Sequence, residues 1–217
     1  MPAGAKAEII YVFDGYCGWC WGIANVVARL AEDFSDRFDF SALSGGLVLG
    51  PRIGPLGDFA DYIERAMPRV EQMTGAIFSE AHRKLIRQRE TIQDSTMPAM
   101  AFALVVETKP QTDTMKLAHA ILRLNFEEGK VLSDPESYGD LFAAFGVPAS
   151  AIADLKNRTA LAGAEAQFAR AREMGAESFP TIVYGREGQY FPLCQGFQSY
   201  ENLSHALTVL HKEPPPL

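Results

Sequence analysis

The chain has 217 residues, with 47% hydrophobic and 22% charged residues and a formal net charge of −7 at pH 7. This acidic balance argues against a nucleic-acid partner, because no run of Lys or Arg offsets it. The first apolar run, residues 9–13, is too short to cross a bilayer, and the segment before it lacks the apolar core of a signal peptide. We therefore expect a cytoplasmic protein with no membrane partner.

The first motif is the Cys-Gly-Trp-Cys sequence at residues 17–20. It follows a β-branched and aromatic stretch at residues 8–13 that predicts a buried strand, and it precedes apolar residues at helical spacing. This order places Cys17 at a helix N-terminus, where unpaired amides and the helix dipole favour a thiolate. Cys20, one turn later, is placed to resolve a mixed disulfide. We predict that Cys17 is the nucleophile and Cys20 the resolving thiol.

Two other roles for the cysteine pair are less favoured. A structural zinc site usually takes four Cys or His ligands, and the chain offers only Cys194 and four scattered histidines besides this motif. A structural disulfide across so short a loop removes little entropy from the unfolded chain. We therefore expect no metal, and the histidines are interpreted as solvated or core residues.

The middle of the chain has a different character from the start. Residues 37–43 predict a second strand, parallel to the first because a helix connects them. From residue 58 to residue 157 only helical patterns are visible. In this block an apolar stripe predicts a helix that ends at Pro68, Gly75 ends a short helix, and Ser133 starts a capping box.

The last part of the chain returns to strands. Residues 161–171 carry the apolar face of a helix, and residues 181–184 begin a hairpin. Its second arm, residues 189–194, contains Pro192, which predicts an edge strand. Cys194 in this arm is interpreted as a small core residue rather than a redox partner.

The order of these elements resembles the two halves of a thioredoxin fold, and the helical block between them resembles the DsbA-like branch of that superfamily. Residues 13–22 read Phe-Asp-Gly-Tyr-Cys-Gly-Trp-Cys-Trp-Gly. They are similar to the motif of the FrnE-like, predicted protein-disulfide-isomerase proteins. Weaker similarities are Gly45-Gly46-Leu47, Met73-Thr74-Gly75, Glu128-Gly129 and Ser178-Phe179-Pro180-Thr181.

The resemblance implies an α/β thioredoxin fold with a large all-helical insertion between its β-α-β and β-β-α halves. The thioredoxin-like domain is then discontinuous, comprising residues 7–50 and 160–213. The insertion domain comprises residues 51–159. The two halves of the sheet must therefore meet across a long stretch of intervening chain.

The same resemblance implies that Pro180 is cis and faces Cys17. The Phe179 backbone is then exposed and able to pair with an extended substrate. Gly18 and Trp19, between the thiols, are expected to contact the substrate, with Trp19 as a flat apolar surface.

The sequence departs from related enzymes in two ways. Many thioredoxin-like enzymes carry a buried acid six residues before the nucleophile, where this chain has Tyr11. A carboxylate that could accept the proton of Cys20 is therefore missing from its usual place. Asp14 is nearer to Cys20 in sequence, but we interpret it as a turn or cap residue. The Gly-Trp dipeptide also lacks the histidine found between the cysteines of strongly oxidising DsbA, which favours a milder redox potential.

These features together predict a thiol–disulfide oxidoreductase or isomerase that requires no metal or organic cofactor. Its expected partners are protein or small-molecule thiols and disulfides, with glutathione as a candidate reductant or substrate. One rival is a glutathione-dependent transferase or isomerase of kappa-class type, which typically has serine where Cys17 stands. A second rival is a non-enzymatic CxxC module that binds a metal or a partner.

Overall fold

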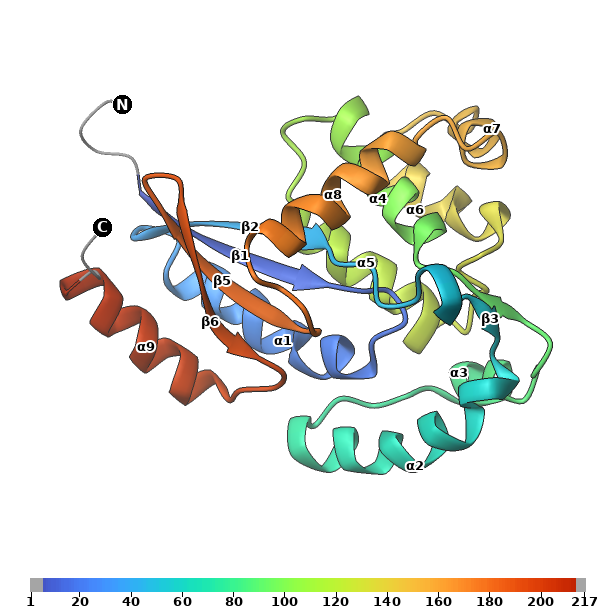
Figure 1. Ribbon diagram of the computed structural model, residues 1–217, viewed down its shortest axis with the longest axis horizontal. Helices are drawn as coiled ribbons and strands as arrows, with labels where there is room; N and C mark the ends of the chain where they lie inside the picture. Colours follow the sequence, from blue (N-terminus) through green and yellow to red (C-terminus); the bar gives the residue numbers. More distant parts are fainter. Residues whose placement is uncertain (1–5, 214–217) are drawn as a thin grey trace.

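The computed structural model describes residues 6–213, and its main sheet has four strands. These are β1 (Ala7–Phe13), β2 (Phe38–Ser44), β5 (Thr181–Arg186) and β6 (Gln189–Gln195), in the order β2-β1-β5-β6 (Figure 1). β1 pairs parallel with β2 and antiparallel with β5, and β6 is an edge strand, as Pro192 predicts. Both ends of the sequence therefore contribute strands to one sheet.

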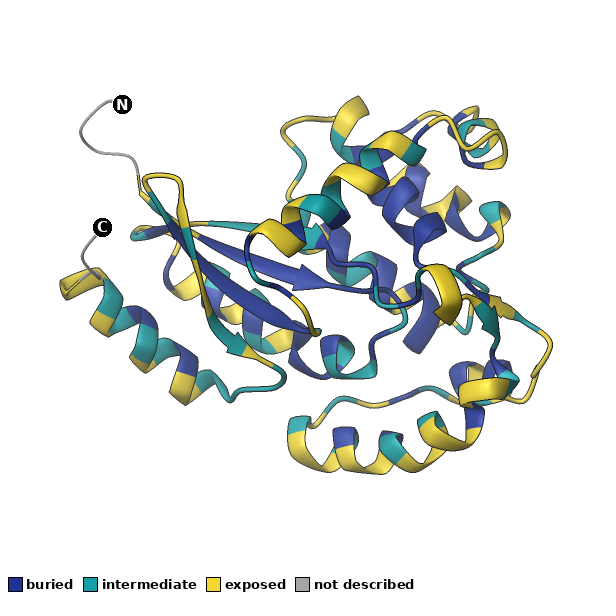
Figure 2. Ribbon diagram, viewed as in Figure 1, coloured by how far each residue is buried: buried dark blue, intermediate teal, exposed yellow. Residues whose placement is uncertain are grey.

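β1 is the central strand and is buried on both faces, as its β-branched and aromatic residues predict (Figure 2). Its side chains alternate between two hydrophobic cores. Ile9, Tyr11 and Phe13 enter one core, and Ile10 and Val12 enter the other. Because β1 has a strand on each side and a core on each face, its C-terminal end is held in a fixed position.

Helices cover both faces of this sheet. α1 (Gly18–Asp33) is the crossover that makes β1 and β2 parallel. Together with α9 (Tyr200–Lys212), it packs on the face that carries Tyr11. On the opposite face, Ala171 near the end of α8 (Leu161–Glu173) packs into the smaller core.

A block of helices separates the two halves of the sheet in sequence. It comprises α2 (Gly57–Thr74), α3 (Glu80–Ile86), α4 (Thr96–Thr108), α5 (Thr114–Phe126), α6 (Gly139–Ala144) and α7 (Ala151–Lys156), with short 3-10 turns at Gly50–Arg52 and Pro135–Tyr138. α4 is its core, since residues 96–105 are all buried. Within residues 6–213, no helix has both the length and the hydropathy needed to cross a membrane.

The prediction that this block contains only helices is wrong in one place. β3 (Gly54–Pro55) and β4 (Ile92–Gln93) form a short antiparallel pair. Each strand has two residues, too few to leave a periodic pattern in the sequence. This pair joins the chain before α2 to the chain after α3.

The predicted helix end at Pro68 is also wrong. α2 continues through Pro68 and ends at Gly75, whose left-handed backbone (φ 74°) matches the predicted C-terminal glycine. Pro68 is exposed, and the buried side chains of Met67 and Val70 on either side hold the helix against the protein. Tertiary packing therefore overrides the local preference of proline.

The predicted capping box at Ser133 does not form. Instead, the Asp134 side chain accepts a hydrogen bond from the Glu136 amide (3.0 Å) and caps the 3-10 turn that follows. The Ser133 hydroxyl donates to the Ile92 carbonyl (2.7 Å) in β4. Ser133 is thus used for a contact between segments that are distant in sequence.

We predict that Pro68→Ala stabilises the protein by about 2 kcal/mol. Proline inside a helix is about 3 kcal/mol less favourable than alanine, and its restriction of the unfolded chain offsets up to about 1 kcal/mol of this. Urea unfolding measures the change, with Arg69→Ala, an exposed neighbour on α2, as the control. A destabilised Pro68→Ala variant would contradict this account of α2.

Candidate active site

The turn after β1 places Cys17 at the start of α1. The Cys17 amide donates to the Asp14 carbonyl (3.1 Å), and α1 begins at Gly18 with Cys17 as its N-cap. The Cys17 sulfur accepts a hydrogen bond from the Cys20 amide at 3.2 Å. The sulfur therefore occupies the place of a capping oxygen, where helix amides and the helix dipole stabilise negative charge.

Cys20 lies behind Cys17 in the first turn of α1. It is completely buried, whereas Cys17 retains 5% exposure and lines a cavity. Burial raises the pKa of the Cys20 thiol well above its ordinary range, and the neighbouring Cys17 sulfur raises it further. Both cysteines are free thiols in this structure. The two sulfurs thus lie in different environments, Cys17 at the cavity wall and Cys20 inside the core.

Asp14 is a completely buried acid near the Cys20 thiol. Its carboxylate accepts hydrogen bonds from the Tyr16 amide (2.9 Å) and the Leu47 amide (2.7 Å). Burial raises the pKa of this carboxyl, and the two amides oppose the rise. The bond from Tyr16 confirms the predicted turn role. The bond from Leu47, which ties the turn to the loop after β2, has no signal in the local sequence.

The loop before β5 meets Cys17 from the other half of the chain. The Phe179–Pro180 peptide is cis, as the resemblance implies. The Cys17 thiol donates a hydrogen bond to the Phe179 carbonyl, with 3.4 Å between sulfur and oxygen. The Thr181 hydroxyl donates to the Ser178 carbonyl (2.6 Å) and helps to hold this loop against the sheet.

Both tryptophans of the motif are partly buried. Trp19 lines the cavity together with Gly18 and packs on Phe197, with 6.5 Å between ring centroids. Trp21 stacks on Phe126 at 6.0 Å, and its indole N–H donates to the Ile77 carbonyl (3.1 Å). Trp19 therefore contributes to the wall beside Cys17, whereas Trp21 connects α1 to the helical block.

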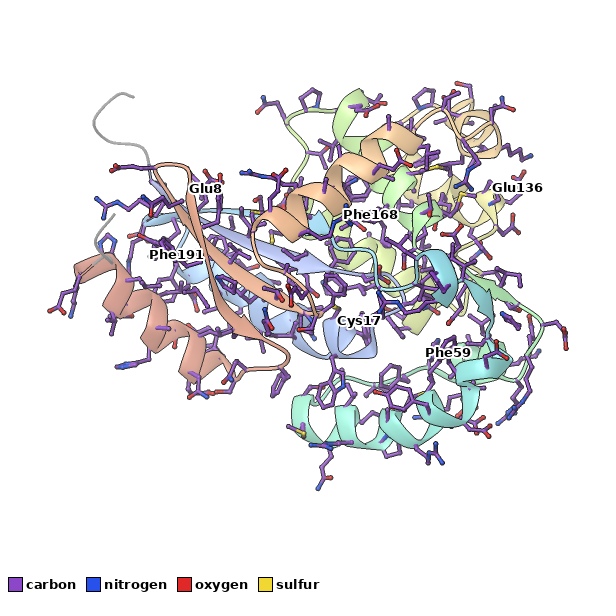
Figure 3. The ribbon with its side chains drawn as sticks, viewed as in Figure 1. Glu8, Cys17, Phe59, Glu136, Phe168 and Phe191 are labelled. Atoms are coloured by element: carbon purple, nitrogen blue, oxygen red, sulfur yellow. The ribbon has the colours of Figure 1, made fainter. Side chains whose placement is uncertain are left out.

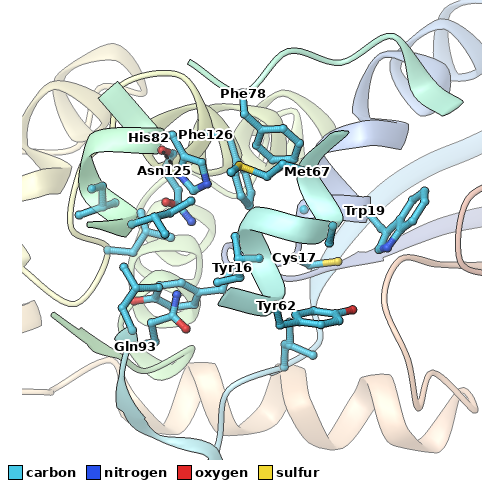
Figure 4. Close-up of a pocket in the computed structure, with 18 of the residues that line it drawn as sticks. Tyr16, Cys17, Trp19, Tyr62, Met67, Phe78, His82, Gln93, Asn125 and Phe126 are labelled. Carbon is cyan, nitrogen blue, oxygen red and sulfur yellow. Dashed lines mark hydrogen bonds between the residues drawn. The ribbon is translucent and has the colours of Figure 1, made fainter. Parts of the chain in front are cut away.

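A cavity of about 380 Å³ opens beside Cys17, between the end of the sheet and α2 (Figures 3 and 4). Its walls come from the Cys17 turn, from α2 and α3, and from the loop before β5. Arg52, Lys130 and Glu177 contribute charged groups to the lining. Most of the wall is apolar and includes Leu56, Met67, Val70, Phe78, Ile86 and Phe126.

His82, to which no partner was assigned from the sequence, is buried in this wall. Its ring packs against Phe78 and Phe126, at centroid distances of 5.5 and 4.9 Å. Nδ1 lies 3.1 Å from the Asn125 carbonyl, and Nε2 has no hydrogen-bond partner among residues 6–213. Burial lowers the pKa of His82 to about 4, so the ring is neutral at neutral pH. Its burial agrees with one of the two positions expected for the histidines, a core position. Phe126 and Asn125 are distant from it in sequence, so these contacts could not be predicted.

Cys194, the third cysteine of the chain, does not line this cavity. Cys194 is half-buried in β6, where it is paired with Ile182 of β5. It packs at the border of the main core rather than inside it. Across residues 6–213, no group of three or more His, Cys, Asp or Glu side chains is arranged to hold a metal ion.

Neither a protein-family model nor a curated protein matches the sequence, but solved structures match the fold. A candidate protein disulfide isomerase from Nitrosomonas europaea is 20% identical, with a TM-score of 0.77 over 96% of this chain and 99% of that chain. The cytosolic disulfide reductase DsbM from Pseudomonas aeruginosa is 24% identical, with a TM-score of 0.70 over 86% and 89%. A DsbA-type protein from Streptomyces coelicolor is 21% identical, with a TM-score of 0.71 over 98% and 93%. The chain has a DsbA-like thioredoxin fold.

The DsbA-like fold confirms the predicted fold class. The β-α-β unit comes first, the helical block is inserted after it, and the hairpin and last helix complete the sheet. Because these identities are below 25%, they establish the fold alone.

The buried His82 predicts a pH-dependent stability. An unfolded histidine binds a proton below about pH 6.5, whereas folded His82 stays neutral down to about pH 4. The unfolded state therefore binds more protons in this window, and stability falls as the pH falls through it. The loss attributable to His82 is at most about 3.5 kcal/mol, since its pKa falls from 6.5 to about 4 and each pKa unit corresponds to about 1.4 kcal/mol.

Urea unfolding of wild type and His82→Phe at a series of pH values measures this effect. We expect the free energy of unfolding of His82→Phe to fall less than that of wild type between neutral and acid pH. His205→Phe, which changes an exposed histidine of α9, should follow wild type. An identical pH dependence for wild type and His82→Phe would refute the prediction.

Proposed function

We propose that this protein is an enzyme that exchanges thiols and disulfides, with Cys17 as the nucleophile and Cys20 as the resolving thiol. The observation that carries the proposal is the position of the two sulfurs. The Cys17 sulfur caps α1 at the wall of the cavity, and Cys20 is completely buried behind it. A substrate sulfur in the cavity therefore meets Cys17 first, at a helix end that stabilises a thiolate.

The reaction begins when the Cys17 thiolate attacks one sulfur of a substrate disulfide. The substrate S–S bond breaks, one product leaves as a thiolate and takes a proton from solvent, and the other stays bound to Cys17 as a mixed disulfide. Cys20 then loses its proton and attacks the Cys17 sulfur. This step forms the Cys17–Cys20 disulfide and releases the second product as a thiolate. Two electrons pass from the protein dithiol to the substrate.

The high pKa of buried Cys20 makes this second step depend on a proton acceptor. Before Cys20 is deprotonated, the mixed disulfide persists long enough for a substrate thiol to attack it. Such an attack rearranges substrate disulfides with no net transfer of electrons, which is isomerisation. The same pair of residues therefore supports both reduction and isomerisation.

A small thiol completes the cycle. Two molecules of glutathione reduce the Cys17–Cys20 disulfide and become one molecule of oxidised glutathione. One of the DsbM structures was determined with GSH. Arg52 and Lys130 in the cavity lining supply positive charges that suit the carboxylates of glutathione or of a peptide. No metal or organic cofactor is needed, because the dithiol itself carries the electrons.

We infer a cytoplasmic location, since the compartment that keeps thiols reduced suits a disulfide reductase. DsbM, with which this chain shares its fold, is described as a cytosolic disulfide reductase. In this location the protein acts on protein or small-molecule disulfides rather than on nucleic acids or membranes.

Single-cysteine variants test the proposed roles. Cys20→Ser keeps the attacking sulfur and removes the resolving one, so mixed disulfides through Cys17 should accumulate to most of the protein. Cys17→Ser should accumulate almost none, because Cys20 is buried and its thiol is protonated. Each variant is incubated with oxidised protein substrates, then separated on a non-reducing gel, and the adducts are identified by mass spectrometry.

Cys194→Ser is the matched control, since it removes a half-buried thiol that does not line the cavity. It should behave like wild type. Equal trapping by Cys17→Ser and Cys20→Ser would reverse the assignment of roles. An absence of trapping by both would exclude thiol–disulfide exchange and favour the CxxC binding module. A glutathione transfer activity that survives Cys20→Ser unchanged would favour the kappa-class type of reaction.

A further inference from the structure

The loop after β2 makes an unusually close approach to the loop before β5. Gly45, the residue after β2, lies against the aromatic ring of Phe179. A Cβ atom added to Gly45 would lie 1.9 Å from Cε1 and 2.4 Å from Cζ of that ring. Such distances are far inside van der Waals contact, so every residue other than glycine at position 45 displaces one of the two groups.

The Gly45 side of this contact is held in place. The Gly45 amide donates to the Phe13 carbonyl at 2.7 Å and so extends the pairing of β1 with β2 by one residue. Two residues later, the Leu47 amide donates to the buried Asp14 carboxylate at 2.7 Å. Gly45 also lacks the left-handed backbone that other glycines of this chain adopt, so alanine fits its conformation. A methyl group there acts only by steric contact, and Phe179 is the group that moves.

The backbone of Phe179 is in turn part of the candidate active site. Its carbonyl accepts the hydrogen bond from the Cys17 thiol, at 3.4 Å. We propose that Gly45 is a positioning residue for thiol–disulfide exchange: by leaving room for the Phe179 ring, it holds the Phe179 carbonyl at Cys17. This inference rests on the proposed function, because it assigns Gly45 a role in the reaction of Cys17.

Displacement of Phe179 changes two rates in opposite directions, that of Cys17 alkylation and that of exchange with a peptide disulfide. The carbonyl can accept a hydrogen bond from a protonated thiol but not from a thiolate, so its departure removes an interaction that favours the unreactive form of Cys17. Alkylation by a small reagent then becomes faster. Exchange with a peptide disulfide becomes slower, because the Phe179 backbone that aligns an extended substrate beside Cys17 is out of place.

A double-mutant cycle tests the inference with Gly45→Ala, Phe179→Ala and the combined variant. The readouts are kcat/KM for a peptide disulfide and the rate of alkylation of each cysteine by iodoacetamide at neutral pH, followed by mass spectrometry. Gly45→Ala should lower kcat/KM by about 10- to 100-fold, the range caused by misplacement of about 1 Å, and should raise alkylation of Cys17 severalfold.

In the Phe179→Ala background the ring is absent, so Gly45→Ala should change neither readout. Gly139→Ala is the matched control, since nothing lies within 4 Å of the Cβ that it adds at the start of α6. It should equal wild type in both assays.

Three results would overturn the inference. The first is a Gly45→Ala variant that folds and equals wild type in both readouts, which would mean that the ring moves without the carbonyl. The second is an effect of Gly45→Ala that persists in full in the Phe179→Ala background, which would mean that Gly45 acts through its own backbone. The third is a Gly45→Ala variant that unfolds, shown by alkylation of the buried Cys20, together with a combined variant that also fails to fold. A wild-type protein that exchanges no disulfides would instead refute the proposed function, and the alkylation rates would still test the role of Gly45.

Discussion

The position of β1 between two strands is the constraint on which the site depends. β1 pairs with β2 on one side and with β5 on the other, so the chain must turn at a fixed point when the strand ends. Asp14 occupies that turn, and its carboxylate holds both the next residues and the loop after β2. α1 then starts at Gly18, which leaves the Cys17 sulfur as the group that caps it. The Cys17 sulfur is therefore located by the sheet as much as by its own helix.

The two thiols differ because their surroundings differ, although they lie one helical turn apart. The Cys17 sulfur lies at the helix end, lines the cavity and accepts a hydrogen bond from the Cys20 amide. Negative charge on this sulfur is therefore stabilised by a hydrogen-bond donor. Cys20 has no solvent exposure, and the buried carboxylate of Asp14 lies beside it, so negative charge there is disfavoured. Charge placed on Cys17 opposes charge on Cys20, so in the proposed mechanism attack and resolution are two successive steps.

Local signals in the sequence were sufficient for the elements that carry the chemistry. The run before Cys17 has strand composition, the glycine at position 75 ends α2, and the edge position of β6 follows from Pro192. Features that depend on contacts between distant segments were not predictable in this way. The continuation of α2 through Pro68 requires the core against which it packs. The burial of His82 requires Phe126 of α5 as well as its sequence neighbour Phe78. Neither feature leaves a complete pattern within one segment.

Two parts of the chain line the cavity. The β-α-β unit supplies Cys17 and Trp19, and the loop before β5 supplies Phe179, so the Cys17 sulfur and its neighbours here come from the segments that adjoin the sheet. The opposite wall consists of α2 and α3, whose apolar side chains come from the helical block. Substitutions in that wall change the shape and polarity of the space without touching the helix end that stabilises Cys17. Substrate preference in this fold is therefore free to vary through the helical block while the dithiol and its electrostatics stay the same.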